Sequence, residues 1–187
     1  MDPILWHQGH VNSDPAVSDC PQSRVSPFRE NAGIAQTQTF TFNQKENALR
    51  TVLVQLYDNL DGNNWIAEKK TNWKTEEPID KWAGLTMEEG KITQLNLSGF
   101  GLNGQLPSGI GTLTDLTKLT ISSNPGLTGP LPSTIGNLAN LDALLAVTTG
   151  LQGPLPKEMG NLKKITNLQL NNNNIDGKIP EEWGGME

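Results

Sequence analysis

The stretch GPLPSTIGNLANL at residues 129–141 returns as GPLPKEMGNLKKI at residues 153–165, with glycine, leucine, proline and asparagine kept at matching positions. Both copies belong to a longer unit that begins with a Leu-x-x-Leu-x-Leu pattern. The pattern starts at Ile92, Leu116, Leu141 and Ile165, which are 24, 25 and 24 residues apart. Each start is followed by a Gly-x-Leu/Ile-Pro segment, at residues 104–107, 129–132, 153–156 and 177–180. The chain therefore contains four tandem repeats between residues 90 and 187.

One repeat of this size cannot bury its own apolar side, so consecutive repeats are expected to stack and share one core. In the Leu-x-Leu part the leucines alternate with polar residues, which is the period of a strand with one buried face. Neighbouring repeats should then pair these strands in parallel. At about 4.8 Å per strand, four of them form a sheet about 19 Å wide.

The residue where each strand ends is Asn124 in the second repeat and Asn173 in the fourth. An inward asparagine amide can bond backbone groups that are otherwise buried without partners at the turn. The first and third repeats have Phe100 and Thr149 there. The sequence thus predicts an asparagine ladder that is interrupted at alternate repeats.

Residues 1–42 have no regular period and are predicted to be an extended or disordered leader, in which TFTF at residues 39–42 forms at most a short strand. Residues 43–89 are predicted to form an N-terminal cap. Its helix has a capping box at Asn43 and Glu46, and it stops at Asp61-Gly62. One apolar stripe runs along this helix through Leu49, Val52, Leu53, Leu56, Tyr57 and Leu60. Three tryptophans in the following loops, Trp65, Trp73 and Trp82, are expected to cover the apolar end of the stack.

Composition and charge argue against several kinds of partner and chemistry. A net charge of −6 with interleaved signs offers no basic surface for nucleic acid or anionic lipid. The adjacent glutamates fit a solvated surface better than paired acid–base catalysis, and no cofactor motif is present. The single cysteine excludes an internal disulfide. The candidate zinc ligands of the leader are His7, His10, Asp14 and Cys20, whose irregular spacing favours a flexible terminus over a structural zinc site.

The repeat pattern resembles the leucine-rich repeat, and its Gly-x-Leu/Ile-Pro segment is similar to the plant-specific subclass. The resemblance implies an α/β solenoid with a short parallel sheet on the concave face, 3-10 or short helical segments on the convex side, and a helical N-terminal cap. It also implies binding rather than catalysis, at a cell surface or after secretion. The cap of plant members carries a cysteine pair that is missing here, so the cap is more similar to those of bacterial (Bacteroidetes-type) or protist surface proteins.

The outward positions of the four strands are the candidate ligand contacts. Amides and hydroxyls dominate, while Leu145 and Val147 form an apolar island in the third repeat, whose first outward position is Ala143. Asn96 also lies in an N-glycosylation motif, Asn-Leu-Ser, that coincides with the repeat consensus. The candidates are Gln94, Asn96, Ser98, Lys118, Thr120, Ser122, Leu145, Val147, Asn167, Gln169 and Asn171.

Three functions fit these features. The first is a module that binds a protein or glycan ligand on the concave face. The second is an inhibitor of a polysaccharide-degrading enzyme, although four repeats offer little area for such an interface. The third is a spacer in a larger surface protein. Because the last repeat ends in EEWGGME without an amphipathic capping piece, we also expect a longer parent protein or self-association through this uncapped repeat.

Overall fold

The computed structural model describes residues 28–185, with side chains from residue 44 onward. By its contacts the chain divides into two compact units, residues 1–38 and 39–187. The described residues of the first unit are helical. The second unit contains the cap and the repeats. The residues of the zinc hypothesis lie outside the described part of the chain: His7, His10, Asp14 and Cys20.

The first helix is longer than the sequence predicted. Helix α1 spans Phe28–Asn59, so the prediction of an extended leader is wrong for residues 28–42, and the TFTF segment is helical instead of a strand. The physical reason lies in the composition, because no proline occurs between Pro27 and Pro78 and the added segment contains good helix formers such as alanine, glutamate and glutamine. Residues 1–27, the rest of the predicted leader, lie outside the described residues.

The capping prediction at the start of this helix is also wrong, whereas the predicted end is confirmed. Asn43 lies inside α1, and the Glu46 carboxylate is 3.7 Å from the Arg50 guanidinium one turn later. At the other end Asp61 adopts a left-handed conformation with φ of 57°, which ends the helix. Four residues of the predicted apolar stripe are buried and two are half-buried: Leu53, Leu56, Tyr57 and Leu60, and then Leu49 and Val52.

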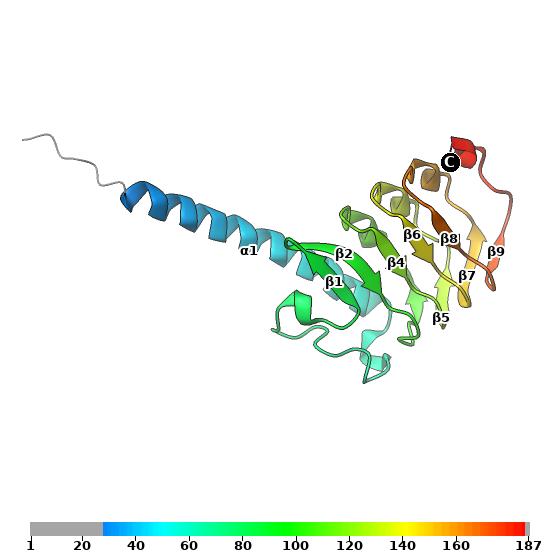
Figure 1. The fold of residues 1–187 in the computed structure, drawn as a ribbon. Coiled ribbons are helices and arrows are strands. Elements are labelled where there is room, and N and C mark those ends of the chain that lie inside the picture. Colours follow the sequence, from blue (N-terminus) through cyan, green and yellow to red (C-terminus); the bar gives the residue numbers. More distant parts are fainter. Residues whose placement is uncertain (1–27, 186–187) are drawn as a thin grey trace, which may run out of the picture. The chain divides into compact units, whose positions relative to one another are not determined.

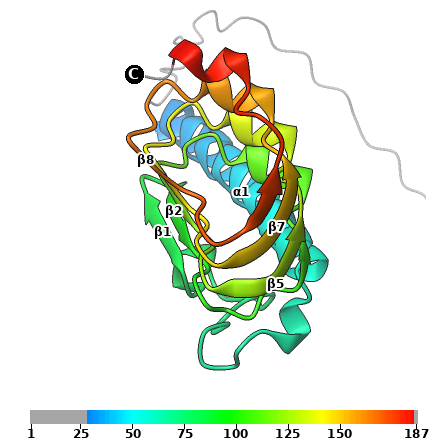
Figure 2. The same cartoon turned by 90° about the vertical axis from the view of Figure 1, so that its right-hand side faces the viewer.

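The repeats form two sheets that run along the stack, seen edge-on in Figure 2. The first sheet has the strand order β1-β2-β4-β6-β8, with β1 antiparallel to β2 and the others parallel. Its strands are β1 (Leu85–Glu88), β2 (Lys91–Asn96), β4 (Lys118–Thr120), β6 (Ala143–Leu145) and β8 (Asn167–Gln169). The second sheet is parallel, and its strands are β3 (Gly104–Gln105), β5 (Asn124–Gly129), β7 (Thr149–Pro154) and β9 (Asn174–Asp176).

The sequence analysis predicted the first sheet and missed the second. The second sheet forms where the chain leaves the ladder position and enters the Gly-x-Leu/Ile-Pro segment. Between the ladder position and that segment, leucines such as Leu127 and Leu151 are buried while Thr128 and Gln152 are exposed. These alternations span only two or three residues, which is too short to be recognised as strands by periodicity alone.

Short 3-10 helices close each repeat and stack beside one another, as Figure 1 shows. The consensus glycine within them permits this close stacking. At Gly136 a Cβ atom would lie 2.2 Å from the Glu158 carbonyl oxygen of the next repeat, so only glycine fits without a shift of the backbone. The helices are η3 (Ser108–Thr112), η4 (Ser133–Asn137), η5 (Lys157–Asn161) and η6 (Glu181–Gly185), and the cap adds η1 (Gly62–Asn64) and η2 (Ile79–Lys81).

The asparagine ladder is confirmed at both predicted positions. Asn124 is fully buried, and its amide donates to the carbonyl oxygens of Leu97 and Ile121 at 2.9 and 2.8 Å. Its Oδ1 accepts the backbone N–H groups of Gly101 and Leu102. Asn173 makes equivalent bonds in the fourth repeat, where its Oδ1 accepts both the backbone N–H and the hydroxyl of Thr149. The threonine at the third position therefore takes part in the ladder.

The predicted role of the cap tryptophans is also confirmed. Trp65, Trp73 and Trp82 are buried, and each indole N–H donates to a backbone carbonyl. Trp65 also packs edge-on against Phe100 with ring centroids 5.6 Å apart, so the aromatic cluster continues into the first repeat. This explains the phenylalanine at the first ladder position.

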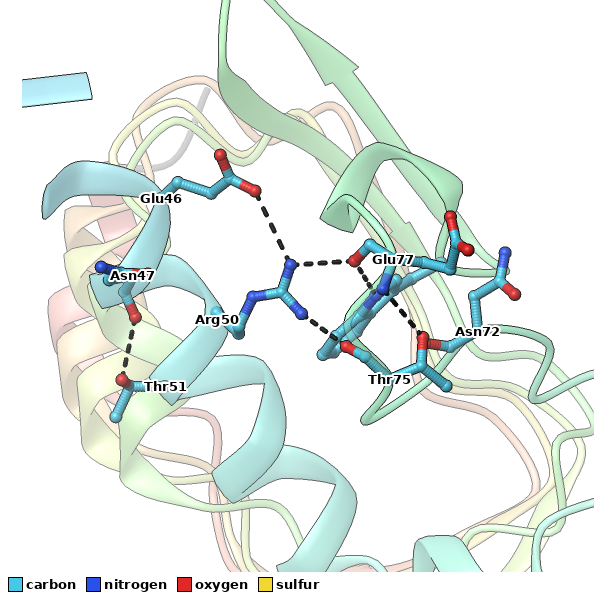
Figure 3. Close-up of polar contacts among 8 residues, drawn as sticks. Glu46, Asn47, Arg50, Thr51, Asn72, Thr75 and Glu77 are labelled. Carbon is cyan, nitrogen blue, oxygen red and sulfur yellow. Dashed lines mark hydrogen bonds and ion pairs between the residues drawn. The ribbon is translucent and has the colours of Figure 1, made fainter. Parts of the chain in front are cut away.

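Arg50 ties helix α1 to the loop that carries these tryptophans (Figure 3). Its guanidinium donates to the Thr75 carbonyl at 2.6 Å and to the Glu77 carbonyl at 2.8 Å. It also lies 5.2 Å from the centre of the Trp82 ring, within the range of a cation–π interaction. The cap is thus held together by aromatic packing and one arginine instead of a disulfide.

Candidate functional site

The candidate site is the outward side of the first sheet, which we call the concave face. Strand pairing brings the predicted residues of the four repeats into aligned rows. In one row Gln94 pairs with Lys118, Lys118 with Ala143, and Ala143 with Asn167. The next row contains Asn96, Thr120, Leu145 and Gln169. The third row continues just beyond the strands with Ser98, Ser122, Val147 and Asn171.

The hydroxyl groups on this face are largely used by the fold itself. Ser98 Oγ donates to the Ser122 carbonyl at 3.1 Å, and Ser122 Oγ accepts the backbone N–H of Val147 at 3.0 Å. Thr120 Oγ1 is buried without a hydrogen-bond partner among the described residues. These three side chains join neighbouring strands or lie beneath their neighbours, so they are poorer ligand contacts than their sequence positions suggested.

The amide side chains, in contrast, remain exposed. Asn96, Asn167 and Gln169 are exposed residues. The Gln169 side-chain amide donates to Asn167 Oδ1 at 3.1 Å, which fixes the orientation of the Asn167 amide. Asn96 Oδ1 accepts the backbone N–H of Ser98 at 3.1 Å. Since both Oδ1 atoms are occupied, the exposed NH2 groups of these asparagines are the parts available to a ligand.

The third repeat differs from the expectation in one respect. Leu145 and Val147 are half-buried, and Ala143, an outward position of its strand, is buried with 7% of its surface exposed. Ala143 therefore forms the floor of the face. The island of Leu145 and Val147 is an aliphatic surface that begins next to this short side chain.

The concave face is also wider than the sequence predicted. Strand β1 pairs with β2 through the register Thr86–Gln94 and brings the exposed side chains of Thr86 and Glu88 onto this side of the sheet. The connecting turn has positive φ at Glu89 and Gly90, as hairpins with two-residue turns require. The sequence contained a signal for this hairpin, because apolar and polar residues alternate on both sides of the Glu89-Gly90 pair. Strand β1 was missed because its residues fell within the segment assigned to the cap.

Comparison with known proteins points to one group of relatives. The Leucine Rich Repeat family model matches residues 164–186. A probable inactive receptor kinase of Arabidopsis thaliana is 37% identical over 82 residues, which cover 43% of this chain and 12% of that protein. A probable leucine-rich repeat receptor-like protein kinase of the same plant is 38% identical over 65 residues, 34% of this chain and 7% of the relative.

Two solved structures have a similar fold. The complex of PEPR1 with AtPEP1 matches with a TM-score of 0.67 and 28% identity, covering 73% of this chain and 19% of that one. The ectodomain of the Arabidopsis thaliana receptor kinase GASSHO1/SCHENGEN3, in complex with CASPARIAN STRIP INTEGRITY FACTOR 2, matches with a TM-score of 0.64 and 29% identity over 74% of this chain and 17% of that one. The chain thus spans less than a fifth of each of these proteins.

These comparisons bear on origin and on location. The relatives are plant proteins, so the predicted likeness of the cap to bacterial or protist surface proteins is not supported. The likeness to a receptor ectodomain agrees with the expected kind of location. In the part of the chain that the structure describes, none of the helices combines the length and apolar character needed to cross a membrane.

Proposed function

We propose, from the premise that this chain is a leucine-rich repeat protein resembling the ectodomains of plant receptor kinases, that it is a non-catalytic module that recognises a ligand on its concave face. The ligand is a protein, a peptide or a glycan. The observation that carries the proposal is the surface of Leu145 and Val147, which stay partly open on a sheet whose neighbouring positions are polar.

The backbone beneath this surface supports such a role. The strands continue their hydrogen bonding beyond their ends, with the Ser123 N–H bonded to the Val147 carbonyl at 2.8 Å and the Ala146 N–H to the Gln169 carbonyl at 2.8 Å. The inward residues Leu144 and Ala146 are fully buried. A rigid backbone places outward side chains without an ordering cost upon binding, which favours recognition.

The relatives provide a second line of support. The structures of PEPR1 and of GASSHO1/SCHENGEN3 are named as complexes with AtPEP1 and CASPARIAN STRIP INTEGRITY FACTOR 2. We therefore expect a ligand of this chain to be an extracellular molecule. Residence at a cell surface or after secretion is part of the same proposal.

The test is a screen of the intact chain against arrays of peptides, purified extracellular proteins and oligosaccharides. Binding of micromolar or tighter affinity should weaken at least tenfold in Leu145→Asp and Val147→Asp, because a carboxylate on the island is desolvated by the ligand without a partner. Gln152→Asp, at an exposed position of β7 in the second sheet, is the matched control. The proposal fails if no ligand binds, or if every ligand found binds the two island variants as well as it binds the unmodified chain.

The same screen distinguishes the other functions considered from the sequence. An inhibitor would bind a glycoside hydrolase and lower its activity. A spacer would bind nothing through this face.

A further inference from the structure

The concave face has one open cation. Among the twelve outward positions that form the three rows, only Lys118 carries a charge. Lys118 is exposed, and none of the four ion pairs within residues 44–185 includes it. Asp115, three residues earlier in the same repeat, pairs with Lys91 at 3.3 Å. The charge of Lys118 is therefore left available to a ligand.

A short side chain lies next to this lysine. In the strand register Ala143 pairs with Lys118 on one side and with Asn167 on the other. Ala143 has only a methyl group, so its position, which we call the notch, is bordered by two longer side chains. Since Gln169 occupies Asn167 Oδ1, the NH2 group of Asn167 is the part that can face this space.

The two side chains that border the notch suit a carboxylate. A carboxylate can accept one charge-assisted hydrogen bond, typically of about 2.8 Å, from each side. An ammonium group on one border and an amide donor on the other provide both bonds. The chemistry of the notch therefore selects an anion acceptor and disfavours a cation.

The aliphatic island begins directly beyond the notch. Leu145 follows Ala143 by two residues on the same side of the strand, a distance of about 6.6 Å. The side chains of residues i and i+2 in an extended peptide have the same spacing. No aromatic residue, the usual platform for a sugar ring, occurs among the twelve outward positions of the three rows. A peptide thus matches the surface better than a glycan does.

We infer that the concave face binds an extended peptide segment in which an acidic side chain and an aliphatic side chain are separated by one residue. The acidic group lies over Ala143 between Lys118 and Asn167, and the aliphatic group lies on Leu145 and Val147. This inference rests on the proposed function and specifies its ligand.

One charge opposes this arrangement and provides a test of it. Asp142 is exposed beside Ala143, and its carboxylate accepts the Thr166 hydroxyl at 2.5 Å. Its negative charge weakens the attraction of the notch for an anion. Asp142→Asn should therefore strengthen binding of the acidic peptide, while Lys118→Gln should weaken it.

The experiment is a selection from a random peptide library displayed on phage, made on the intact chain and on each variant. We expect peptides with Glu or Asp two positions from Leu, Ile or Val to be enriched on the unmodified chain and on Lys157→Gln. Lys157 is an exposed lysine at the start of η5, so it controls for the loss of one positive charge. The enrichment should disappear on Lys118→Gln. Circular dichroism would establish that each variant folds.

The affinity of one selected peptide and of its Glu→Gln version provides the quantitative test. The acidic peptide should bind the unmodified chain roughly three- to tenfold more tightly than its amide version, with a larger ratio for Asp142→Asn and a ratio near one for Lys118→Gln. Added salt should reduce the ratio.

Each contrary result has a distinct meaning. Selected peptides without an acidic preference, whose binding still depends on Leu145, would overturn the acidic subsite and leave the proposed function standing. Lys118-dependent binding of an acidic oligosaccharide, with no peptide selected, would overturn the peptide class. If no molecule of any class binds through Leu145 in the broader screen, the proposed function fails together with this inference.

Discussion

The two ends of the repeat stack are built from similar residues and are buried very differently. At the cap end, Leu95 and Leu97 of the first repeat are fully buried, in the same core cluster as the tryptophans of the cap. In the fourth repeat, Leu168 and Leu170 are only half-buried, and Ile179 is 71% exposed. Because each repeat is stabilised mainly by its neighbours, we expect the cap end to be the stable part of the described chain and the fourth repeat to open first.

The largest effect should follow from removing a tryptophan of the cap. Trp82→Ala empties a fully buried site and should lower the free energy of unfolding by about 3–5 kcal/mol. Trp183 in the fourth repeat is half-buried and makes one bond to the Pro156 carbonyl at 3.2 Å. Trp183→Ala should therefore cost only about 1–2 kcal/mol. Urea unfolding followed by circular dichroism measures both, and equal losses would contradict the difference between the ends.

The two ladder asparagines, Asn124 in the second repeat and Asn173 in the fourth, allow the two ends to be compared through buried hydrogen bonds. Asn124→Ala leaves buried backbone groups of Ile121 and Leu102 without partners and removes one of the two bonds to the Leu97 carbonyl, and we expect a loss of about 3 kcal/mol. Asn173 makes similar bonds but is half-buried, so water can replace them.

Asn173→Ala should accordingly cost about half as much. Amide hydrogen exchange would show where each loss acts, with faster exchange around the second repeat for one variant and only in the fourth repeat for the other. If Asn173→Ala proves as costly as Asn124→Ala, the fourth repeat is covered in solution by another molecule.

The sequence predicts those features whose residue pattern recurs in every repeat, and it misses those that depend on only a few residues. The repeat spacing, the Leu-x-Leu strands and the ladder at Asn124 were predictable because each pattern recurs and only one periodic structure satisfies all copies. The second sheet was not, because alternation over a few residues around Leu127 and Leu151 does not distinguish a strand from a turn. The extension of α1 to Phe28 was missed because the segment is polar and lacks an apolar stripe.

The site was predictable in its positions and not in its chemistry. The alternation of the strands identified the outward rows. It could not reveal that the Ser98 and Ser122 hydroxyls are used between strands, because that depends on which carbonyl lies opposite in the neighbouring repeat. Nor could it show that Ala143 forms a floor beside Lys118, since burial on a sheet face is set by the side chains of both neighbouring strands.

The consensus glycine of the 3-10 helices allows a further comparison of the two ends. Its replacement by alanine is expected to change the stability in opposite directions at the two positions. Gly136 and Gly184 occupy equivalent positions in their 3-10 helices. A Cβ at Gly136 meets the Glu158 carbonyl oxygen, whereas at Gly184 nothing lies within 4 Å. Gly136→Ala should destabilise the chain by about 1–3 kcal/mol. Gly184→Ala should be neutral or stabilising by up to about 1 kcal/mol, because alanine restricts the unfolded chain.

Thermal unfolding at several protein concentrations measures both glycine variants. Self-association through the fourth repeat would change the second result. In that case Gly184→Ala would meet an atom of the partner, its cost would rise with protein concentration, and analytical ultracentrifugation would detect the larger species in the unmodified chain.

The smallest effect concerns the residue just before the ladder position. Gly99, Ser123, Thr148 and Asn172 all have positive φ there, between 55° and 62°. A β-branched side chain is strained in this region, whereas asparagine tolerates it. Thr148→Asn should therefore stabilise the chain by about 0.5 kcal/mol, and Asn172→Thr should destabilise it by a similar amount.

These two substitutions exchange threonine and asparagine in opposite directions at equivalent positions. The change in backbone strain therefore has opposite signs in the two variants, while the pair of side chains is the same. The third repeat lies between two others, and the fourth has a neighbour on one side only among the described residues. A gain from Thr148→Asn that appears in the midpoint of global unfolding, together with a loss from Asn172→Thr confined to hydrogen exchange in the fourth repeat, would establish that the open end unfolds independently. If both substitutions shift the global midpoint equally, the four repeats unfold as one cooperative unit and the contrast in burial between the two ends has no consequence for stability.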